Sequence, residues 1–240
     1  MPCPELDFAR VRVVTFDAGG TLLTPNPGVG EVYAEVLARF GLTLAPALLD
    51  QRFRAAFKEL TATRPRPFVS EATERVFWWE VVRRCLAPEC PEDLLGKVFI
   101  ALWEEFASAP RWRVLPGVEA ALTALAAQSS LRLAILSNWD SRLHRVLHDF
   151  PWARHFERVF ISSEIGVEKP DLRAFRAVES ALGLSASACL HLGDSYDHDA
   201  LAAQHAGWQA ILISSKPPAV DTSLNHLTSL NELPAILTNL

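Results

Sequence analysis

Five short apolar runs, separated along most of the chain by helical patterns, constrain the fold of this chain more than any other feature. Each run is bounded by Gly, Asp, Ser or Asn, as is typical of parallel strands whose two faces are both covered. Because helical patterns lie between the later runs, the sequence predicts an α/β protein with a doubly wound parallel sheet. The predicted strands are residues 12–17, 131–137, 158–162, 188–193 and 209–213.

Local signals mark the ends of several predicted helices. Asp171 is suited to cap a helix over residues 171–182, and Gly183 follows its end. Ser229 and Glu232 have the spacing of a capping box, which predicts a last helix to about residue 237. Further helices are predicted over residues 116–127, 142–150 and 200–206.

The region between the first two predicted strands has a different pattern. Residues 26–110 contain four stretches with apolar residues at helical spacing, namely 33–40, 47–60, 71–86 and 92–106. A stretch of this length is too long for a single crossover helix. We therefore predict an α/β core of residues 1–25 and 111–240, with residues 26–110 inserted as a helical cap that acts as a mobile lid.

Composition excludes several function classes. The chain has 240 residues, of which 50% are hydrophobic, and a formal net charge of −5. It shows no basic stripe, no apolar stretch of membrane-spanning length and no signal-peptide pattern, so we expect neither nucleic acid nor membrane as a partner. The four cysteines lack metal-binding spacing, which favours reduced thiols and a cytoplasmic location. The pattern does not predict an oligomeric state.

Three polar residues end predicted strands. They are Asp17, Ser137 and Asp194, and Lys169 lies between the last two, before a proline. Ligands bind at the carboxyl ends of the strands in an open parallel sheet, so these residues are expected to converge. A carboxylate there can attack phosphorus, and a Mg²⁺ ion held by Asp17 and Asp194 would offset the negative charges. Ser137 and Lys169 can hold the remaining phosphoryl oxygens.

The residues next to Asp17 and Ser137 complete the predicted substrate-binding site. Gly20 allows the backbone to approach a phosphate in a tight turn, and Thr21 can form hydrogen bonds around Asp17. Asn138 directly follows Ser137. A phosphorylated small molecule is therefore the predicted ligand.

With these motifs in order, the chain resembles the haloacid dehalogenase-like superfamily, which has a Rossmann-like core and, in one subgroup, a helical cap of the C1 type. Asp17 matches the nucleophile of the first motif, Ser137 the second motif and Lys169 the third. Gly193-Asp194-Ser195 with Asp199 matches the fourth. The resemblance implies a Mg²⁺ site formed by Asp17, Asp194 and the carbonyl of Gly19, with support from Asp199.

Gly19 departs from the family pattern. In family phosphatases this position is an aspartate that protonates the leaving oxygen and later activates water. Loss of such a group costs a factor of about 10²–10⁴ in rate. Asp140 and His198 are candidate replacements by proximity in the sequence.

Four functions are compatible with these motifs. The first is a Mg²⁺-dependent phosphatase with weakened acid/base catalysis, favouring acyl or aryl phosphates. The second is a catalytically impaired phosphate-binding or interaction protein. The third is a 2-haloacid dehalogenase, whose reaction needs no acid but whose fourth motif typically has Ser or Asn. The fourth is a phosphonatase-type hydrolase, for which Lys58 and Lys97 are the only cap lysines.

Overall fold

The computed structural model describes residues 6–64, 68–216 and 224–237. By its contacts the chain divides into two compact units. The core unit consists of Met1–Thr24, Val114–Trp139 and Pro151–Leu240, and the helical unit consists of Pro25–Arg113 and Asp140–Phe150. The stretch 140–150 is thus grouped with the helices of the insertion, whereas the sequence prediction placed it in the core.

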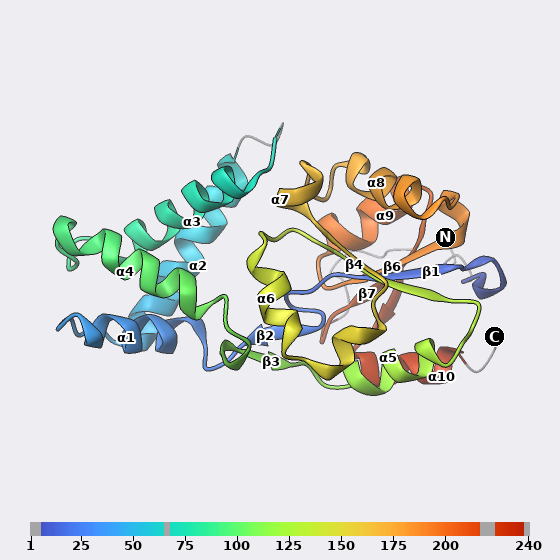
Figure 1. The fold of residues 1–240 in the computed structure, drawn as a ribbon, viewed down its shortest axis with the longest axis horizontal. Coiled ribbons are helices and arrows are strands. Elements are labelled where there is room, and N and C mark those ends of the chain that lie inside the picture. The colour runs from blue at the N-terminus through green and yellow to red at the C-terminus, as the bar shows by residue number, and fades with distance from the viewer. Residues whose placement is uncertain (1–5, 65–67, 217–223, 238–240) are drawn as a thin grey trace. The chain divides into compact units, whose positions relative to one another are not determined.

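A six-stranded parallel sheet lies at the centre of the core unit (Figure 1). Its strand order is β5-β4-β1-β6-β7-β8. The strands are β1 (Val13–Phe16), β4 (Arg132–Ser137), β5 (Arg158–Ile161), β6 (Cys189–Gly193), β7 (Gln209–Ile213) and β8 (Asn225–Leu227). Strand β1 pairs with β4 on one side and with β6 on the other, with Phe16 opposite Ile135 and Leu192. The doubly wound parallel sheet predicted from the sequence is confirmed.

Helices cover both faces of this sheet, as Figure 1 shows. Helices α8 (Leu172–Leu182) and α9 (Ala202–His205) lie on one face, and α5 (Val118–Ala126) and α10 (Leu233–Leu237) lie on the other. Phe175 of α8 packs edge-to-face on Trp208, with ring centroids 5.2 Å apart. The remaining helical segments of the core unit are η1 (Phe8–Arg10), η3 (Pro151–His155), α7 (Ser162–Ile165), η4 (Ala186–Ala188), the π-helix η5 (Tyr196–Leu201) and η6 (Leu230–Glu232).

The predicted helix caps are present in the structure. The Asp171 side chain accepts a hydrogen bond from the Arg173 amide, and Gly183 ends α8 with a φ of 68°. Ser229 and Glu232 form the expected capping box. One prediction needs correction, because the helix expected over residues 200–206 begins earlier, as the π-helix η5. Strand β8 was not predicted. Strand β8 has the polar sequence Asn-His-Leu, which lacks the apolar character that identified the other strands.

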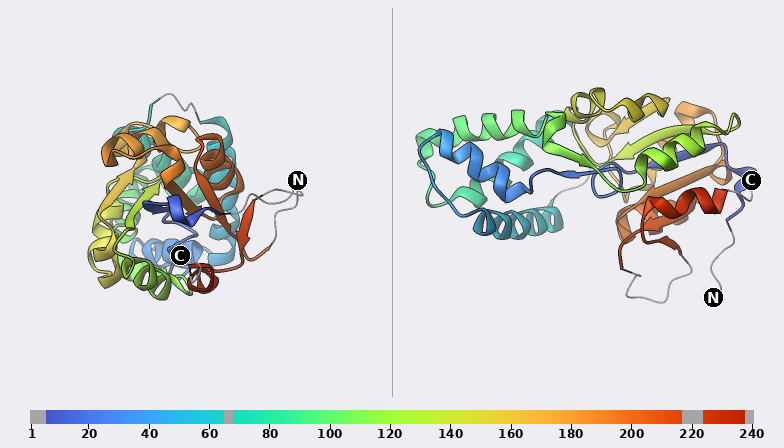
Figure 2. Two further views of the ribbon diagram at one scale, coloured as in Figure 1. Left: turned by 90° about the vertical axis from the view of Figure 1, so that its right-hand side faces the viewer. Right: turned by 90° about the horizontal axis from the view of Figure 1, so that it is seen from below.

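The helical unit contains α1 (Val29–Arg39), α2 (Pro46–Thr63), α3 (Glu71–Leu86), α4 (Glu92–Glu105), η2 (Ala109–Arg111) and α6 (Arg142–His148). Figure 2 shows α1 to α4 grouped as a bundle. Its apolar core includes Tyr33, Leu49, Val81 and Phe99. Two short strands, β2 (Leu23–Pro25) and β3 (Trp112–Val114), pair where the chain enters and leaves the insertion.

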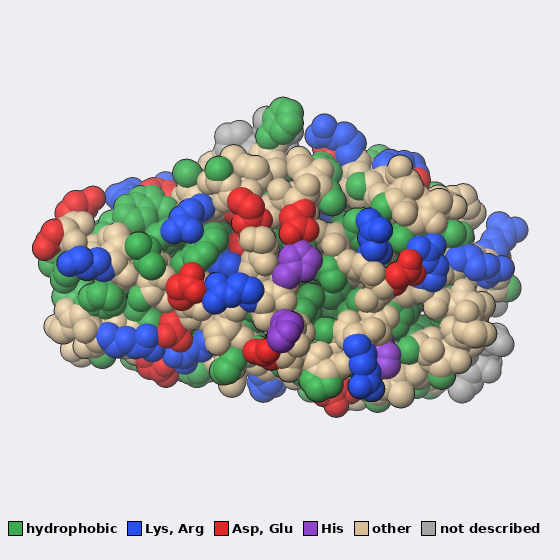
Figure 3. Space-filling model, viewed as in Figure 1, with side chains coloured by type: hydrophobic (Ala, Val, Ile, Leu, Met, Phe, Trp, Pro, Cys, Tyr) green, Lys and Arg blue, Asp and Glu red, His purple; other side chains and the backbone are tan. Residues whose placement is uncertain are grey.

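Figure 3 shows basic and acidic side chains interspersed on the face in view. Among the residues that the structure describes, no helix combines the length and the apolar character that crossing a membrane requires. Cys85, Cys90 and Cys189 are free thiols, and Cys3 lies outside the described residues.

Candidate active site

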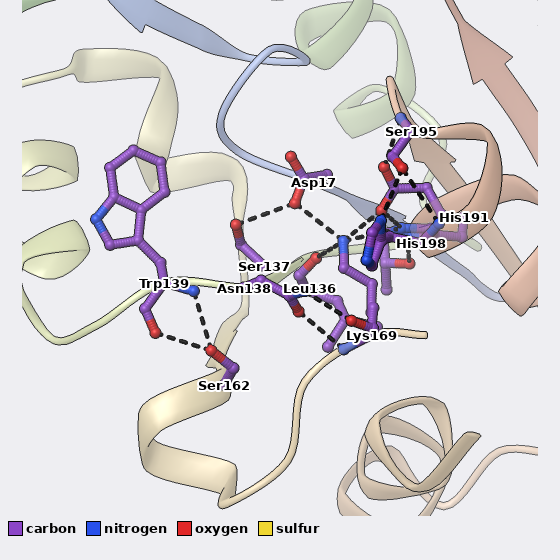
Figure 4. Close-up of polar contacts among 12 residues, drawn as sticks. Asp17, Leu136, Ser137, Asn138, Trp139, Ser162, Lys169, His191, Ser195 and His198 are labelled. Atoms are coloured by element: carbon purple, nitrogen blue, oxygen red, sulfur yellow. Dashed lines mark hydrogen bonds and ion pairs between the residues drawn. The ribbon is translucent and has the colours of Figure 1, made fainter. Parts of the chain in front are cut away.

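The sheet topology brings the predicted site residues to one edge of the core unit. Asp17 directly follows β1, Ser137 ends β4, and Asp194 directly follows β6. Because β1 lies between β4 and β6, the carboxyl ends of these three strands are neighbours. Lys169 precedes α8, and Asp199 lies in the π-helix η5. Figure 4 shows the polar contacts that connect these segments.

Asp17 is held through one of its two carboxylate oxygens. The Ser137 hydroxyl donates to Oδ1 at 3.0 Å, and the Lys169 ammonium donates to the same oxygen at 2.9 Å. Only 8% of Asp17 is exposed. Burial raises the pKa of Asp17, and the charge of Asp199 adds to this effect, whereas the Lys169 ammonium opposes it. The two contacts fix the carboxylate and leave Oδ2 as the oxygen that they do not use.

Lys169 is a buried cation that connects two carboxylates. Its Nζ donates to Oδ1 of Asp17, to Oδ1 of Asp199 at 2.5 Å and to the carbonyl of Leu136 at 2.7 Å. An ammonium has three hydrogens, so each has an acceptor. Burial alone would lower the pKa of Lys169, but the two carboxylates outweigh it and raise the pKa. Lys169 therefore stays charged and organises the acidic residues.

His191 extends this buried network on the side of Asp199. Its Nε2 lies 3.1 Å from Oδ1 of Asp199, and its Nδ1 lies 2.8 Å from Oγ1 of Thr15. A carboxylate oxygen only accepts, so Nε2 carries the proton and Nδ1 accepts from the Thr15 hydroxyl. Burial, together with the charge of Lys169, lowers the pKa of His191. The ring is therefore a neutral donor that orients Asp199.

The Asn138 side chain forms two hydrogen bonds with the backbone of Lys169. Its Nδ2 donates to the Lys169 carbonyl at 2.8 Å, and its Oδ1 accepts from the Lys169 amide at 2.8 Å. The side-chain amide thus fixes the segment that carries the buried ammonium. A direct contact between Asn138 and substrate stays a prediction, as does the substrate-binding role of Thr21, which is buried and whose hydroxyl has no partner among the described residues.

Three carboxylates form a cluster with the donor set of a cation site. Ligand atoms of Asp17, Asp194 and Asp199 all lie within 4.8 Å of one another. Two of these carboxylates are packed closely against glycines. A Cβ on Gly20 would overlap the Asp194 carboxylate, and a Cβ on Gly193 would overlap the Asp199 carboxylate. Gly20 also has a φ of 85°, which other residues rarely adopt.

The carboxylates differ in proton affinity. Burial alone would raise the pKa of Asp199, but the Lys169 charge and the hydrogen bond from His191 outweigh it and hold the pKa below the usual range. Partial desolvation, followed by the charges of Asp17 and Asp199, raises the pKa of Asp194 to about 7. Because Asp194 is exposed to solvent, we attribute more of this rise to repulsion between the carboxylates than to desolvation.

The charges and ligand types of this cluster fit a divalent cation. When all three carboxylates are ionised, they and the one ammonium, beside a neutral imidazole, leave an excess of two negative charges. Carboxylate oxygens are the ligands that Mg²⁺ prefers. The residues present therefore fit a divalent cation such as Mg²⁺. That Asp17, Asp194 and Asp199 are its side-chain ligands stays a prediction. A contribution from the Gly19 carbonyl stays a prediction.

The two candidate replacements for an acid at position 19 have partners of their own. Asp140 is fully buried and accepts two hydrogen bonds from the Arg142 guanidinium, each 2.7 Å long. Nδ1 of His198 lies 3.1 Å from the Ser195 hydroxyl. The space beside Gly19 is lined by Trp139, whose Cζ3 would lie 3.3 Å from a Cβ at that position.

Sequence reasoning missed three residues of this site: Thr15, Trp139 and His191. A signal for His191 was available, because a polar residue in a buried parallel strand needs a partner and this one stands two residues before Gly193. Thr15 gave the same signal, because it is a polar residue in the buried strand β1, two residues before Asp17. Trp139 carried no such signal.

The model of the haloacid dehalogenase-like hydrolases matches residues 11–207, so the chain belongs to this family. Among curated relatives, the human haloacid dehalogenase-like hydrolase domain-containing protein 3 is 31% identical over 215 residues, which cover 88% of this chain and 85% of the relative.

Solved structures of two enzyme classes share the fold. The defluorinating L-2-haloacid dehalogenase matches with a TM-score of 0.74 and 21% identity, covering 95% of each chain. A phosphatase of the family from Thermococcus onnurineus matches with a TM-score of 0.64 and 19% identity, covering 95% of this chain and 98% of the other. At these identities the likeness shows the fold, and the reaction has to be argued from the site.

Proposed function

We propose that this hydrolase is a Mg²⁺-dependent phosphatase that acts on a small phosphate ester through an aspartyl-phosphate. The observation that carries the proposal is the hydrogen bonding of the Asp17 carboxylate. One oxygen is fixed by Ser137 and Lys169, while Oδ2 is not engaged by either contact, and two further carboxylates lie close by. A fixed carboxylate of this kind is suited to nucleophilic attack.

The chain's own residues have distinct roles in this proposal. Oδ2 of Asp17 attacks phosphorus, because Oδ1 is the oxygen held by Ser137 and Lys169. The Ser137 hydroxyl and the Lys169 ammonium orient the nucleophile and can follow the phosphoryl oxygens as charge shifts onto them. His191 and Asn138 hold Asp199 and the Lys169 backbone in place. When bound at Asp17, Asp194 and Asp199, Mg²⁺ would supply positive charge for the phosphoryl oxygens.

Gly19 sets the leaving groups that the enzyme would accept. No acidic side chain extends from this position, and Asp140 is engaged by Arg142. The favoured substrates are therefore phosphates whose leaving group departs without a proton, such as acyl and aryl phosphates.

A second candidate is a 2-haloacid dehalogenase, and Gly19 is the observation that favours it, because a halide leaves without protonation. The cluster with Asp194 favours the phosphatase instead, since attack on a carbon–halogen bond has no need of a site for a divalent cation. Phosphate binding without turnover, and a phosphonatase-type reaction, are further outcomes for the test.

The test is a screen of aryl, acyl and alkyl phosphates and of 2-haloacids, with and without Mg²⁺. We expect release of phosphate that requires Mg²⁺ and disappears in Asp17→Asn. Asp149→Asn, an exposed site in the helical unit, is the matched control and should keep full activity. Halide release without Mg²⁺, in the absence of phosphatase activity, would replace this proposal with the dehalogenase. Phosphate binding without hydrolysis of any ester would identify a binding protein.

The remaining parts of the proposal concern the surroundings of the enzyme. We propose a small phosphorylated molecule as the partner and no nucleic acid, which the mixed charges in Figure 3 support. A cytoplasmic location is supported by the free thiols Cys85, Cys90 and Cys189.

A further inference from the structure

Trp139 is placed where an acid at position 19 would extend. An ideal Cβ on Gly19 would lie 3.3 Å from Cζ3 and 4.0 Å from Cε3 of the indole. The φ of Gly19 is outside the left-handed region, so the backbone does not demand glycine there. The indole, and not the backbone, is therefore what limits a side chain at position 19.

The backbone of Trp139 is held by three hydrogen bonds. The Ser162 hydroxyl accepts from the Trp139 amide at 3.0 Å and donates to the Trp139 carbonyl at 3.0 Å, and the Ser163 amide donates to the same carbonyl at 3.2 Å. Figure 4 shows Trp139 in the turn that also carries Ser137 and Asn138, with Ser162 bridging its backbone. These bonds fix the backbone from which the indole extends towards position 19.

The indole lies near the nucleophile. Trp139 is two residues beyond Ser137, which touches Asp17, and it lies against Gly19, which is two residues beyond Asp17. Trp139 is also partly exposed. The site thus has an aromatic surface beside the nucleophile, at the place where the family's phosphatases have an acid.

We propose that Trp139 selects the leaving group and that the substrates are aryl phosphate monoesters, whose ring packs on the indole. This inference rests on the phosphatase activity proposed above. Oδ2 of Asp17 forms a bond to phosphorus while the bond to the aryl oxygen breaks, and the phenolate leaves with the electron pair. Phenolate takes a proton from solvent. Water then hydrolyses the aspartyl-phosphate to free Asp17 and inorganic phosphate, so an ester and one water give a phenol and phosphate.

The aromatic contact can be tested without turnover. Phenylphosphonate and methylphosphonate are titrated by calorimetry, with Mg²⁺, into wild type, Trp139→Phe and Trp139→Ala. An aromatic pair adds stabilisation that corresponds to about a tenfold tighter Kd for the phenyl compound. We expect this ratio in wild type, most of it in Trp139→Phe, and a ratio near one in Trp139→Ala. An unchanged ratio in Trp139→Ala would overturn the inference.

A second experiment replaces Gly19 and measures kcat/KM. Gly19→Asp alone should not increase kcat/KM for alkyl phosphates, because the indole obstructs the new side chain. Gly19→Asp with Trp139→Ala should increase it by about 10²-fold, as for a restored general acid. An equal gain from Gly19→Asp alone would overturn the role given to the indole.

The two proposals fail in different ways. If esters are hydrolysed through Asp17 but the phosphonate ratio does not depend on Trp139, the phosphatase stands and the aryl specificity is wrong. If Asp17→Asn hydrolyses phosphate esters as wild type does and neither phosphonate binds, both are wrong. Circular dichroism of each variant shows whether it is folded, and the phosphonate titration remains decisive if the double variant does not fold.

Discussion

Arg142 binds both carboxylate oxygens of Asp140, through Nε and Nη2, each at 2.7 Å. The two side chains are 8% and 0% exposed, and the guanidinium carbon lies 3.6 Å from the centre of the Trp103 ring. Asp140 is therefore an ion-pair partner within the helical unit. In this structure it is not a replacement for the acid that position 19 lacks.

Removing one member of this pair should be more harmful than removing both. Asp140→Ala leaves the Arg142 charge buried without its partner, at a cost of about 3–5 kcal/mol in unfolding free energy. Asp140→Ala with Arg142→Met should recover most of this loss. Urea unfolding followed by circular dichroism measures both. Glu104→Ala, which breaks the exposed pair with Arg145, should cost about 1 kcal/mol or less. A double variant no more stable than Asp140→Ala would contradict this expectation.

Glycine at position 20 should be required for two reasons: it adopts the local backbone conformation, and it leaves room for the Asp194 carboxylate at the cation site. Alanine at Gly20 meets two penalties, a φ of 85° and overlap with the Asp194 carboxylate. Gly166 has a φ of 80° with nothing within 4 Å of an added Cβ. Both substitutions should therefore cost about 1–2 kcal/mol of backbone strain, measured by urea unfolding. Gly20→Ala should cost more because of the overlap with Asp194, and only Gly20→Ala should also lose Mg²⁺ binding in calorimetry. Equal Mg²⁺ affinity in the two variants would show that Asp194 moves without consequence.

Mg²⁺ should stabilise the folded protein through Asp194. A ligand at 100 times its Kd adds about 2.7 kcal/mol to the free energy of unfolding. We expect a corresponding rise in Tm with MgCl₂ in wild type and none in Asp194→Ala. Asp197→Ala removes an exposed carboxylate of the same segment that is outside the cluster, and it should respond as wild type does. A response of Asp194→Ala equal to that of wild type would place the ion elsewhere.

The affinity for Mg²⁺ should depend on pH around neutrality. The pKa of Asp194 is raised to about 7, and a protonated carboxyl is a poor ligand. Below pH 7 a proton must leave before the ion binds, so the apparent Kd should rise about tenfold for each unit of falling pH. Above pH 7 the group is already ionised and the affinity should level off. Calorimetry between pH 5.5 and 8.5 measures this dependence, and a flat profile would mean that Asp194 is ionised throughout.

The sequence predicted the core and the convergence of the site because both depend on regular, local signals. Parallel strands are short and apolar, and their carboxyl ends lie at one edge, so the strand pattern alone places Asp17, Ser137 and Asp194 near one another. Asp171 and Gly183 mark helix ends through their own backbone chemistry, and they occupy the predicted positions.

Other features depend on contacts between distant segments and left no local pattern. Trp139 faces Gly19 across 120 positions of sequence, and nothing in either segment indicates that the indole fills this space. The network that joins Lys169 to Leu136 and Asp199 is likewise a product of the tertiary fold. Helix α6 has an ordinary amphipathic pattern, so its sequence could not show that Arg142 packs on Trp103 of the insertion.

The membership of α6 has a consequence for how this protein can be divided. The helical unit is assembled from two separate stretches, so the chain crosses between the units at 24/25, 113/114, 139/140 and 150/151. A shortened chain without residues 25–113 would keep α6 but remove Trp78 and Trp103, the aromatic partners of Arg142. If the insertion were exchanged for that of a relative, α6 would likewise lose the side chains on which it packs in this protein. Residues 25–113 and 140–150 therefore form one structural unit, and a chimaeric protein would have to exchange both stretches together.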